Sequence, residues 1–174
     1  MQIKPKQTMA NNKLLLLYLL NKSDIPLSEL QLVRIFSDLS FMGYFDLKEC
    51  MFELEQNRHI SSRSTPQSVV YSITEKGANM LRVLCEDLRL SFREGIDQYL
   101  EAHSSELKME SQLVGEMIKL SSSEYRVILK VLEEDRTVFE LNCIVYSKDA
   151  AQTMLDNWRA NAVSLYKDVL MRLS

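Results

Sequence analysis

The sequence predicts an α+β protein in which a helical module with a β-hairpin is joined by a long helix to a three-stranded antiparallel sheet. Three observations predict this class. The first 76 residues combine apolar positions at helical spacing with one short β-rich stretch. Residues 75–101 keep a helical apolar stripe without a proline. Residues from about 108 to 146 alternate apolar and polar positions, and the helical spacing then returns. We therefore divide the chain into residues 1–76, 77–104 and 105–174.

Two helices are expected first. Residues 11–21 contain the run Leu14–Leu20, which gives a wide apolar face, and Asn11 or Asn12 can cap the helix. A second helix is expected over 28–37, with Ser28 as its N-cap and Gln31 three residues later, as in a capping box.

The third helix is expected over 46–57, after a connection at 37–44 that contains Gly43. Asp46 is placed to cap it. One stripe of this helix is apolar and is expected to face the core: Leu47, Cys50, Met51 and Leu54. The opposite face is polar apart from one aromatic residue: Lys48, Glu49, Phe52, Glu53 and Gln56.

A β-hairpin is expected next, from strands at 60–64 and 68–73 joined by the turn Thr65-Pro66-Gln67. Thr74 is a good cap for the helix that follows. That helix is expected to continue to about residue 101, with Gly95 marking a bend.

The C-terminal part is expected to form an antiparallel sheet with one buried face. A first strand is expected within 109–120, and strands at 124–133 and 136–146 are expected to be joined by Glu134-Asp135. A helix over 148–172 is expected to cover this sheet with one apolar stripe: Ala151, Met154, Leu155, Trp158, Ala162, Leu165 and Val169.

Charge and cysteine content restrict the functional classes. The chain of 174 residues has a net charge of −3, which is unusual for a nucleic-acid-binding protein, although residues 1–76 are close to neutral with 9 basic and 8 acidic side chains. Its three cysteines show no metal-binding spacing, so we expect buried free thiols, no metal and a reducing, cytoplasmic location. The apolar run Leu14–Leu20 is short and no small-residue cleavage site follows it, so we expect no secretory signal. No segment approaches the length of a membrane span, so we expect no membrane association.

One string of residues points to a particular fold within this class. Tyr71-Ser72-Ile73-Thr74-Glu75-Lys76-Gly77 closes the hairpin, and three helices precede it. Here Tyr71 and Ile73 are expected to point from one face of the strand into the helices, and Gly77 to let the next helix approach closely. This order resembles the winged helix-turn-helix fold of bacterial regulators.

Further segments are similar to a family of uncharacterised winged helix-turn-helix proteins of Gram-positive bacteria. These segments are Leu14–Leu20, Pro26-Leu27-Ser28, Tyr44-Phe45-Asp46-Leu47 and Glu53-Leu54. The resemblance spans most of the chain, and that family also carries a C-terminal α+β part of unknown role. It implies a transcriptional regulator by fold, and a fold does not by itself establish a function.

In such a module the third helix enters the major groove of double-stranded DNA and the wing contacts the backbone or the minor groove. The resemblance therefore implies DNA contacts from the third helix, the residue after it and the wing: Lys48, Phe52, Gln56, Arg58, Arg63, Thr65 and Gln67. Lys4 and Lys6 form a small basic arm. Regulators of this type commonly pair as homodimers, and the C-terminal part is expected to dimerise or to sense an unknown effector.

The alternative is a winged helix that binds a protein partner and no DNA. Glu49, Glu53 and Glu55 make the third helix acidic, and an exposed Phe52 suits a protein contact. We expect no enzymatic activity and no cofactor, because the two histidines, His59 and His103, are isolated in the sequence and there is no glycine-rich phosphate loop or nucleophile motif.

Overall fold

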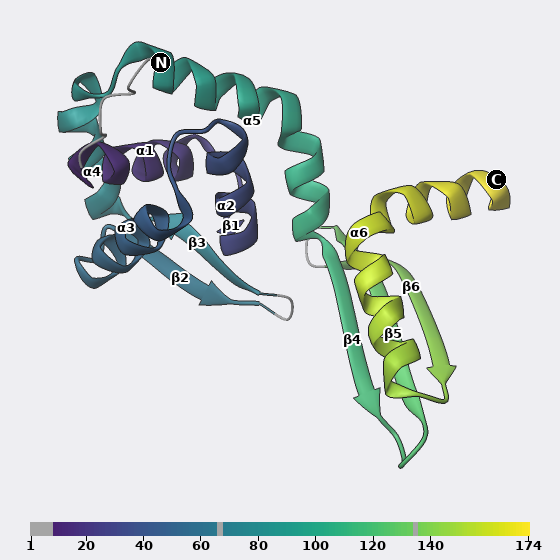
Figure 1. The fold of residues 1–174 in the computed structure, drawn as a ribbon. Coiled ribbons are helices and arrows are strands. Elements are labelled where there is room, and N and C mark those ends of the chain that lie inside the picture. The colour runs from purple at the N-terminus through teal and green to yellow at the C-terminus, as the bar shows by residue number, and fades with distance from the viewer. Residues whose placement is uncertain (1–8, 66–67, 134–135) are drawn as a thin grey trace, which may run out of the picture. The chain divides into compact units, whose positions relative to one another are not determined.

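The fold was analysed in a computed structural model that describes residues 9–65, 68–133 and 136–174. This part of the chain is α+β, with six α-helices and two three-stranded antiparallel sheets (Figure 1). It divides into two compact units, residues 1–104 and 105–174. None of the helices in the described ranges combines the length and the apolar character that a membrane span requires.

The N-terminal unit is built around α1 (Met9–Lys22). The side chains of Leu14–Leu20 are all buried, so this helix is surrounded by protein along its middle. A helix that is apolar on every side belongs in a core. The helix begins before Asn11 and Asn12, so the prediction that one of them caps it was wrong, and the Asn12 side chain is buried within the unit.

Two further helices follow. α2 (Glu29–Asp38) begins at Ser28, whose hydroxyl accepts a hydrogen bond from the Gln31 backbone N–H while the Gln31 side chain accepts one from the Ser28 N–H. The predicted capping box is thereby confirmed. α3 (Tyr44–Gln56) begins two residues earlier than expected, with Gly43 at its N-cap position and Asp46 inside its first turn. Asp46 is therefore not the cap.

The first sheet has the strand order β1-β3-β2. The expected hairpin is present as β2 (Ile60–Ser64) and β3 (Val69–Ile73), and its turn residues Pro66 and Gln67 lie outside the described residues. The two-residue strand β1 (Leu27–Ser28) was not predicted. It pairs with the opposite edge of β3, Leu27 with Tyr71 and Ser28 with Val70. This pairing joins the start of α2 to the hairpin.

The expected continuous helix over 75–101 is two helices. α4 (Glu75–Leu84) ends in a 3₁₀ turn at Cys85–Asp87, and α5 (Leu90–Ser111) begins after it. The break lies before Gly95 rather than at it. A Cβ at Gly95 would lie 2.8 Å from Cζ of Phe41, so glycine allows α5 to pack closely against the end of the α2–α3 connection.

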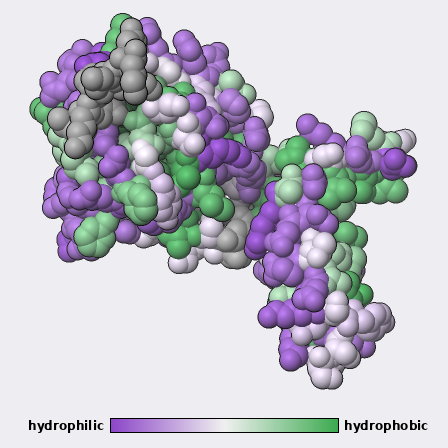
Figure 2. All heavy atoms as spheres, in the orientation of Figure 1, coloured by the Kyte–Doolittle hydropathy of each residue, from purple (hydrophilic) through white to green (hydrophobic). Residues whose placement is uncertain are grey.

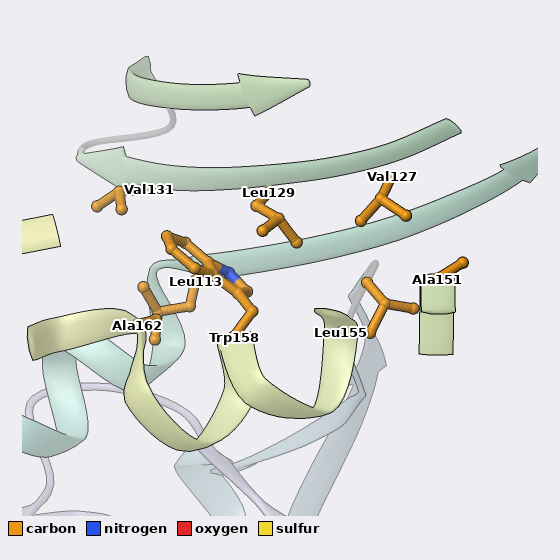
Figure 3. Close-up of a cluster of buried hydrophobic side chains, with 8 residues drawn as sticks. All are labelled: Leu113, Val127, Leu129, Val131, Ala151, Leu155, Trp158 and Ala162. Carbon is orange, nitrogen blue, oxygen red and sulfur yellow. The ribbon is translucent and has the colours of Figure 1, made fainter. Parts of the chain in front are cut away.

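The second unit has the strand order β4-β5-β6, formed by β4 (Leu113–Lys119), β5 (Tyr125–Glu133) and β6 (Arg136–Val145). All neighbours are antiparallel, as predicted, and the turn at Glu134-Asp135 lies outside the described residues. α6 (Lys148–Leu173) packs along one face of this sheet. Figure 3 shows the resulting core, with side chains of both layers facing each other: Leu113, Val127, Leu129, Val131, Ala151, Leu155, Trp158 and Ala162.

The first part of the apolar stripe expected on α6, up to Ala162, is buried except for Met154, which is half-buried. In the second part Leu165 is exposed and Val169 is half-buried, so this part of the stripe leaves the sheet. The three cysteines are free, and Cys50 is buried, which raises the pKa of its thiol to about 12. Cys85 and Cys143 are half-buried, so the expectation of buried thiols holds for Cys50 and not for the other two.

Candidate nucleic-acid interface

The residues singled out from the sequence lie on α3, on the residues after it and on the β2–β3 hairpin. α3 buries the predicted stripe Leu47, Cys50, Met51 and Leu54 against the unit, which turns its opposite face to solvent. On that face Phe52 is 64% exposed and Gln56 is exposed at the last turn. The helix therefore presents a solvent-facing side of three turns beside the hairpin.

The junction between α3 and the hairpin is held by the Thr74–Gly77 string. The Thr74 hydroxyl donates to the Arg58 carbonyl at 2.7 Å and accepts from the Gly77 N–H at 3.1 Å, so it caps α4 as predicted. A Cβ at Gly77 would lie 2.0 Å from the His59 carbonyl oxygen, which confirms the predicted close approach. Lys76 Nζ donates to the Asn57 carbonyl at 2.9 Å, at the end of α3. The string thus fixes the end of α3 relative to the hairpin.

A further hydrogen bond joins α3 directly to the hairpin. The hydroxyl of Ser62, on β2, donates to Glu55 Oε1, on α3. This contact and the junction at Arg58 and His59 make the helix and the hairpin one continuous surface. They also occupy one of the carboxylates that gave α3 its acidic character.

Two arginines are exposed at this surface. Arg58 follows α3 in a left-handed backbone conformation, with a φ of 58°. Arg63 lies on β2, paired in register with Val70 of β3. Both side chains are exposed, and the two residues lie at opposite ends of the segment that leads from the helix into β2. They can therefore act as separate phosphate-binding cations.

Lys48 is less available than the sequence suggested. Its ammonium lies 2.8 Å from Glu29 Oε2, at the start of α2, and this hydrogen bond raises the Lys48 pKa. The pair links α2 to α3. A second pair links α1 to α3, between Lys13 and Glu53. Sequence patterns did not reveal these pairs, because the partners are separated by 19 and 40 residues.

Thr65 and Gln67 were expected to contact DNA from the wing. The Thr65 hydroxyl donates to the Ser68 carbonyl at 2.8 Å and its oxygen faces the Ser68 N–H at 3.2 Å, so this side chain closes the hairpin turn. Gln67 lies outside the described residues, as do Lys4 and Lys6 of the N-terminal arm.

Sequence reasoning missed an exposed apolar component of the same surface. Phe45 is 85% exposed and Tyr44 is 52% exposed, at the first turn of α3, and their rings pack edge to face at 5.6 Å. Phe45 and Phe52 are seven residues apart, so they lie within about 20° of each other around the helix. The sequence pattern predicted a helix that begins at residue 46, which left Phe45 outside it.

His59, between α3 and β2, has a lowered pKa. Partial burial lowers it below the usual value, and the positive charges of Lys76 and Lys13 lower it further. Its imidazole is therefore neutral at pH 7 and adds no cation to this surface. Within the described ranges there is no group of three or more acidic, histidine or cysteine side chains placed to hold a metal ion.

Comparisons with known proteins identify a family and no function. No curated protein and no solved structure gives a significant match to this chain. One family model matches residues 12–173, which covers most of both compact units and nearly all of the described residues. The chain belongs to this family, which is described as a domain of unknown function (DUF4364).

Proposed function

We propose that the protein is a DNA-binding transcriptional regulator whose N-terminal unit is a winged helix-turn-helix and which acts as a homodimer. In this proposal α2 and α3 are the helix-turn-helix, the β2–β3 hairpin is the wing, and α3 is the helix that approaches the major groove. The observation that carries the proposal is the hydrogen-bonded connection between α3 and the hairpin, through Glu55–Ser62 and Thr74–Arg58. A helix and a wing held in a fixed relation can contact a groove and its flanking phosphates together.

The candidate DNA-binding residues differ in how available their side chains are. Arg58 and Arg63 are exposed and suit phosphates, and Gln56 and Phe52 lie on the α3 face that would meet base edges. Lys48 is the weaker candidate contact, because the Glu29 carboxylate neutralises its charge. The wing and the end of α3 therefore supply most of the favourable electrostatic energy in this arrangement.

The test is an electrophoretic shift assay with genomic fragments over a series of salt concentrations. Arg63→Ala is expected to weaken binding similarly for all sequences and to lower the slope of log K against log salt by about one. Arg89→Ala is the matched control, since Arg89 is also exposed but lies directly before α5, away from α3 and the hairpin in sequence. A folded protein that shifts no fragment at low salt would refute DNA binding. An unchanged slope would remove Arg63 from the interface.

A second variant tests the role given to the Lys48–Glu29 pair. Glu29→Gln removes the carboxylate that holds the Lys48 ammonium and takes one negative charge from the surface. We expect tighter DNA binding and a steeper salt dependence than in the wild type. If binding to DNA weakens instead, Lys48 does not become a phosphate contact.

The second candidate function is the binding of a protein partner by the same face. The exposed aromatic residues Phe45 and Phe52 favour it, because aromatic side chains are enriched in protein interfaces and α3 also carries the exposed Glu49. Partners recovered with the wild-type chain would be purified and their binding remeasured. A complex that Phe52→Ser abolishes, that Arg63→Ala leaves intact and that depends little on salt would support this function over DNA binding.

A further inference from the structure

The last turns of α6 extend beyond the sheet that its first half covers. The buried positions of α6 end at Ala162, and Tyr166 makes an edge-to-face contact with Phe139 of β6 at 5.5 Å. After Tyr166 the helix continues for seven residues, which is about 10 Å. Figure 1 shows these turns running past the ends of the strands.

This extension is apolar on the side that continues the core stripe. At about 100° per residue, Leu165, Val169 and Leu173 lie on the same side of the helix as Trp158. Leu165 is 44% exposed and Leu173 is 81% exposed, and Leu170 beside them is 46% exposed. Figure 2 shows hydrophobic surface along this part of the helix. A helix end with so much exposed apolar surface is only marginally stable in water unless another surface covers it.

The sequence of the extension is complementary to itself. Leu165 and Leu173 lie four residues on either side of Val169, so a two-fold axis at Val169 sets each leucine against the other from a second copy. On one flank of this stripe stand Asp168 and Arg172, one acid and one base. Antiparallel helices related by a two-fold axis bring the same flanks together. Asp168 of one copy then lies only about 3 Å along the axis from the level of Arg172 of the other, within reach of that long side chain, and the reverse.

We propose that the extension of α6, residues 163–173, pairs antiparallel with the same segment of a second copy. The proposal deepens the homodimeric part of the proposed function by naming its surface, and it does not require DNA binding. A parallel pair would set the charged flank against the apolar flank of Tyr166 and Leu170 and would leave Asp168 and Arg172 without partners across the interface. Two segments of this length make a small interface, so the dimer is expected to dissociate on dilution.

The first test measures the mass of the full chain by sedimentation velocity from low micromolar to submillimolar concentration. Val169→Glu is expected to give a monomer throughout. Asn157→Glu adds the same charge at an exposed position of α6 that lies before residues 163–173, and it is expected to dimerise as the wild type does. Circular dichroism and the fluorescence of Trp158 check that each variant is folded. A wild-type chain that is monomeric at every concentration would overturn the proposal, as would equal dissociation of both variants.

A charge exchange tests the antiparallel arrangement. Asp168→Arg and Arg172→Asp are each expected to weaken the dimer, because each makes the flank uniform in charge, and the double variant is expected to restore it. Failure of the double variant to recover, with its helix content unchanged, would exclude this pairing of flanks.

Cysteine cross-linking gives an independent result. Val169→Cys is expected to form a disulfide between copies under mild oxidation, because the axis brings the two positions together. Leu165→Cys is not expected to do so, since two copies of that position would be about 12 Å apart along the helix. The wild-type chain under the same conditions accounts for Cys50, Cys85 and Cys143. Equal cross-linking of both variants would indicate a parallel pair and overturn the antiparallel proposal. If the dimer fails these tests while DNA is still shifted, the DNA-binding proposal stands without it.

Discussion

Tyr18 shows how one buried polar side chain holds two helices of the N-terminal unit. It belongs to α1 and is 6% exposed, and its hydroxyl lies 3.0 and 3.1 Å from the two carboxylate oxygens of Asp97 on α5. Burial, the hydrogen bond to Asp97 and the negative charge of Asp97 together raise the pKa of Tyr18 to about 12. Tyr99 of α5 makes a similar contact, at 2.8 Å, with Asp38 at the end of α2. Two tyrosine–aspartate pairs therefore attach α5 to the rest of this unit.

Replacing Tyr18 by Phe tests this attachment. Hydrogen bonds to charged groups contribute about 1.5–3 kcal/mol, so Tyr18→Phe is expected to lower the free energy of unfolding by that order at pH 7. The folded pKa is above the unfolded value, so the contribution of the wild-type tyrosine is complete below pH 10 and is lost between about pH 10 and pH 12. Urea unfolding at several alkaline pH values should show this loss in the wild type and a weaker one in the variant. Parallel pH profiles would show that Tyr18 does not titrate in this way.

Local chemistry and tertiary contact explain which elements the sequence could predict. The capping box of α2 and the cap of α4 depend on residues three positions apart, and both were predicted. The break between α4 and α5 could not be predicted locally, because Cys85–Asp87 contains no proline or glycine. It places Leu88 in the core and lets Gly95 pack on Phe41, contacts between segments far apart in the sequence. Such contacts outweigh local helix propensity, which a sequence pattern alone measures.

The candidate interface was predictable to a similar extent. The solvent-facing side of α3 followed from its buried stripe, and the hairpin followed from its β-rich strands. The Lys48–Glu29 and Ser62–Glu55 contacts did not, because each depends on how separate elements pack together. The strand β1 was missed for the same reason, since two residues carry no periodicity and their pairing partner is β3.

Gly77 sets the distance between α4 and the start of β2. A Cβ there would lie 2.0 Å from a backbone oxygen, which cannot move aside without shifting the strand. We expect Gly77→Ala to destabilise the N-terminal unit by about 1–3 kcal/mol or more. Gly43→Ala is the control, since a Cβ at that N-cap position meets nothing closer than 3.8 Å. We expect it to cost only about 0.5–1 kcal/mol, because alanine is a poorer N-cap residue than glycine. Urea midpoints of the two variants decide the comparison, and equal losses would contradict it.

Each of the two compact units has its own core. The chain has a single tryptophan, Trp158, and its ring is buried between α6 and the second sheet. Tryptophan fluorescence therefore reports the unfolding of the C-terminal unit, whereas circular dichroism reports the helices of both units. The two observables need not give the same transition in a protein with two independently packed cores.

A core substitution in the N-terminal unit tests this independence. Leu16 is fully buried in α1, and Leu16→Ala is expected to cost about 2–5 kcal/mol in that unit. The circular dichroism transition should move to lower urea concentration while the midpoint of Trp158 fluorescence stays where it is in the wild type. Coincident curves that shift together would show that the two units unfold as one cooperative system.

The leucine run of α1 has a consequence for the chain before it folds. In the native unit Leu14–Leu20 is covered on all sides, but during synthesis it is an exposed, uncharged segment of the kind that promotes aggregation. Lys13 and Lys22 stand directly before it and two residues after it. In the folded unit Lys13 pairs with Glu53, and the ammonium of Lys22 lies over the Tyr18 ring. In the nascent chain the same two positive charges are expected to oppose association between unfolded copies. Replacing both lysines by uncharged residues should therefore reduce the soluble yield by more than it reduces the free energy of unfolding.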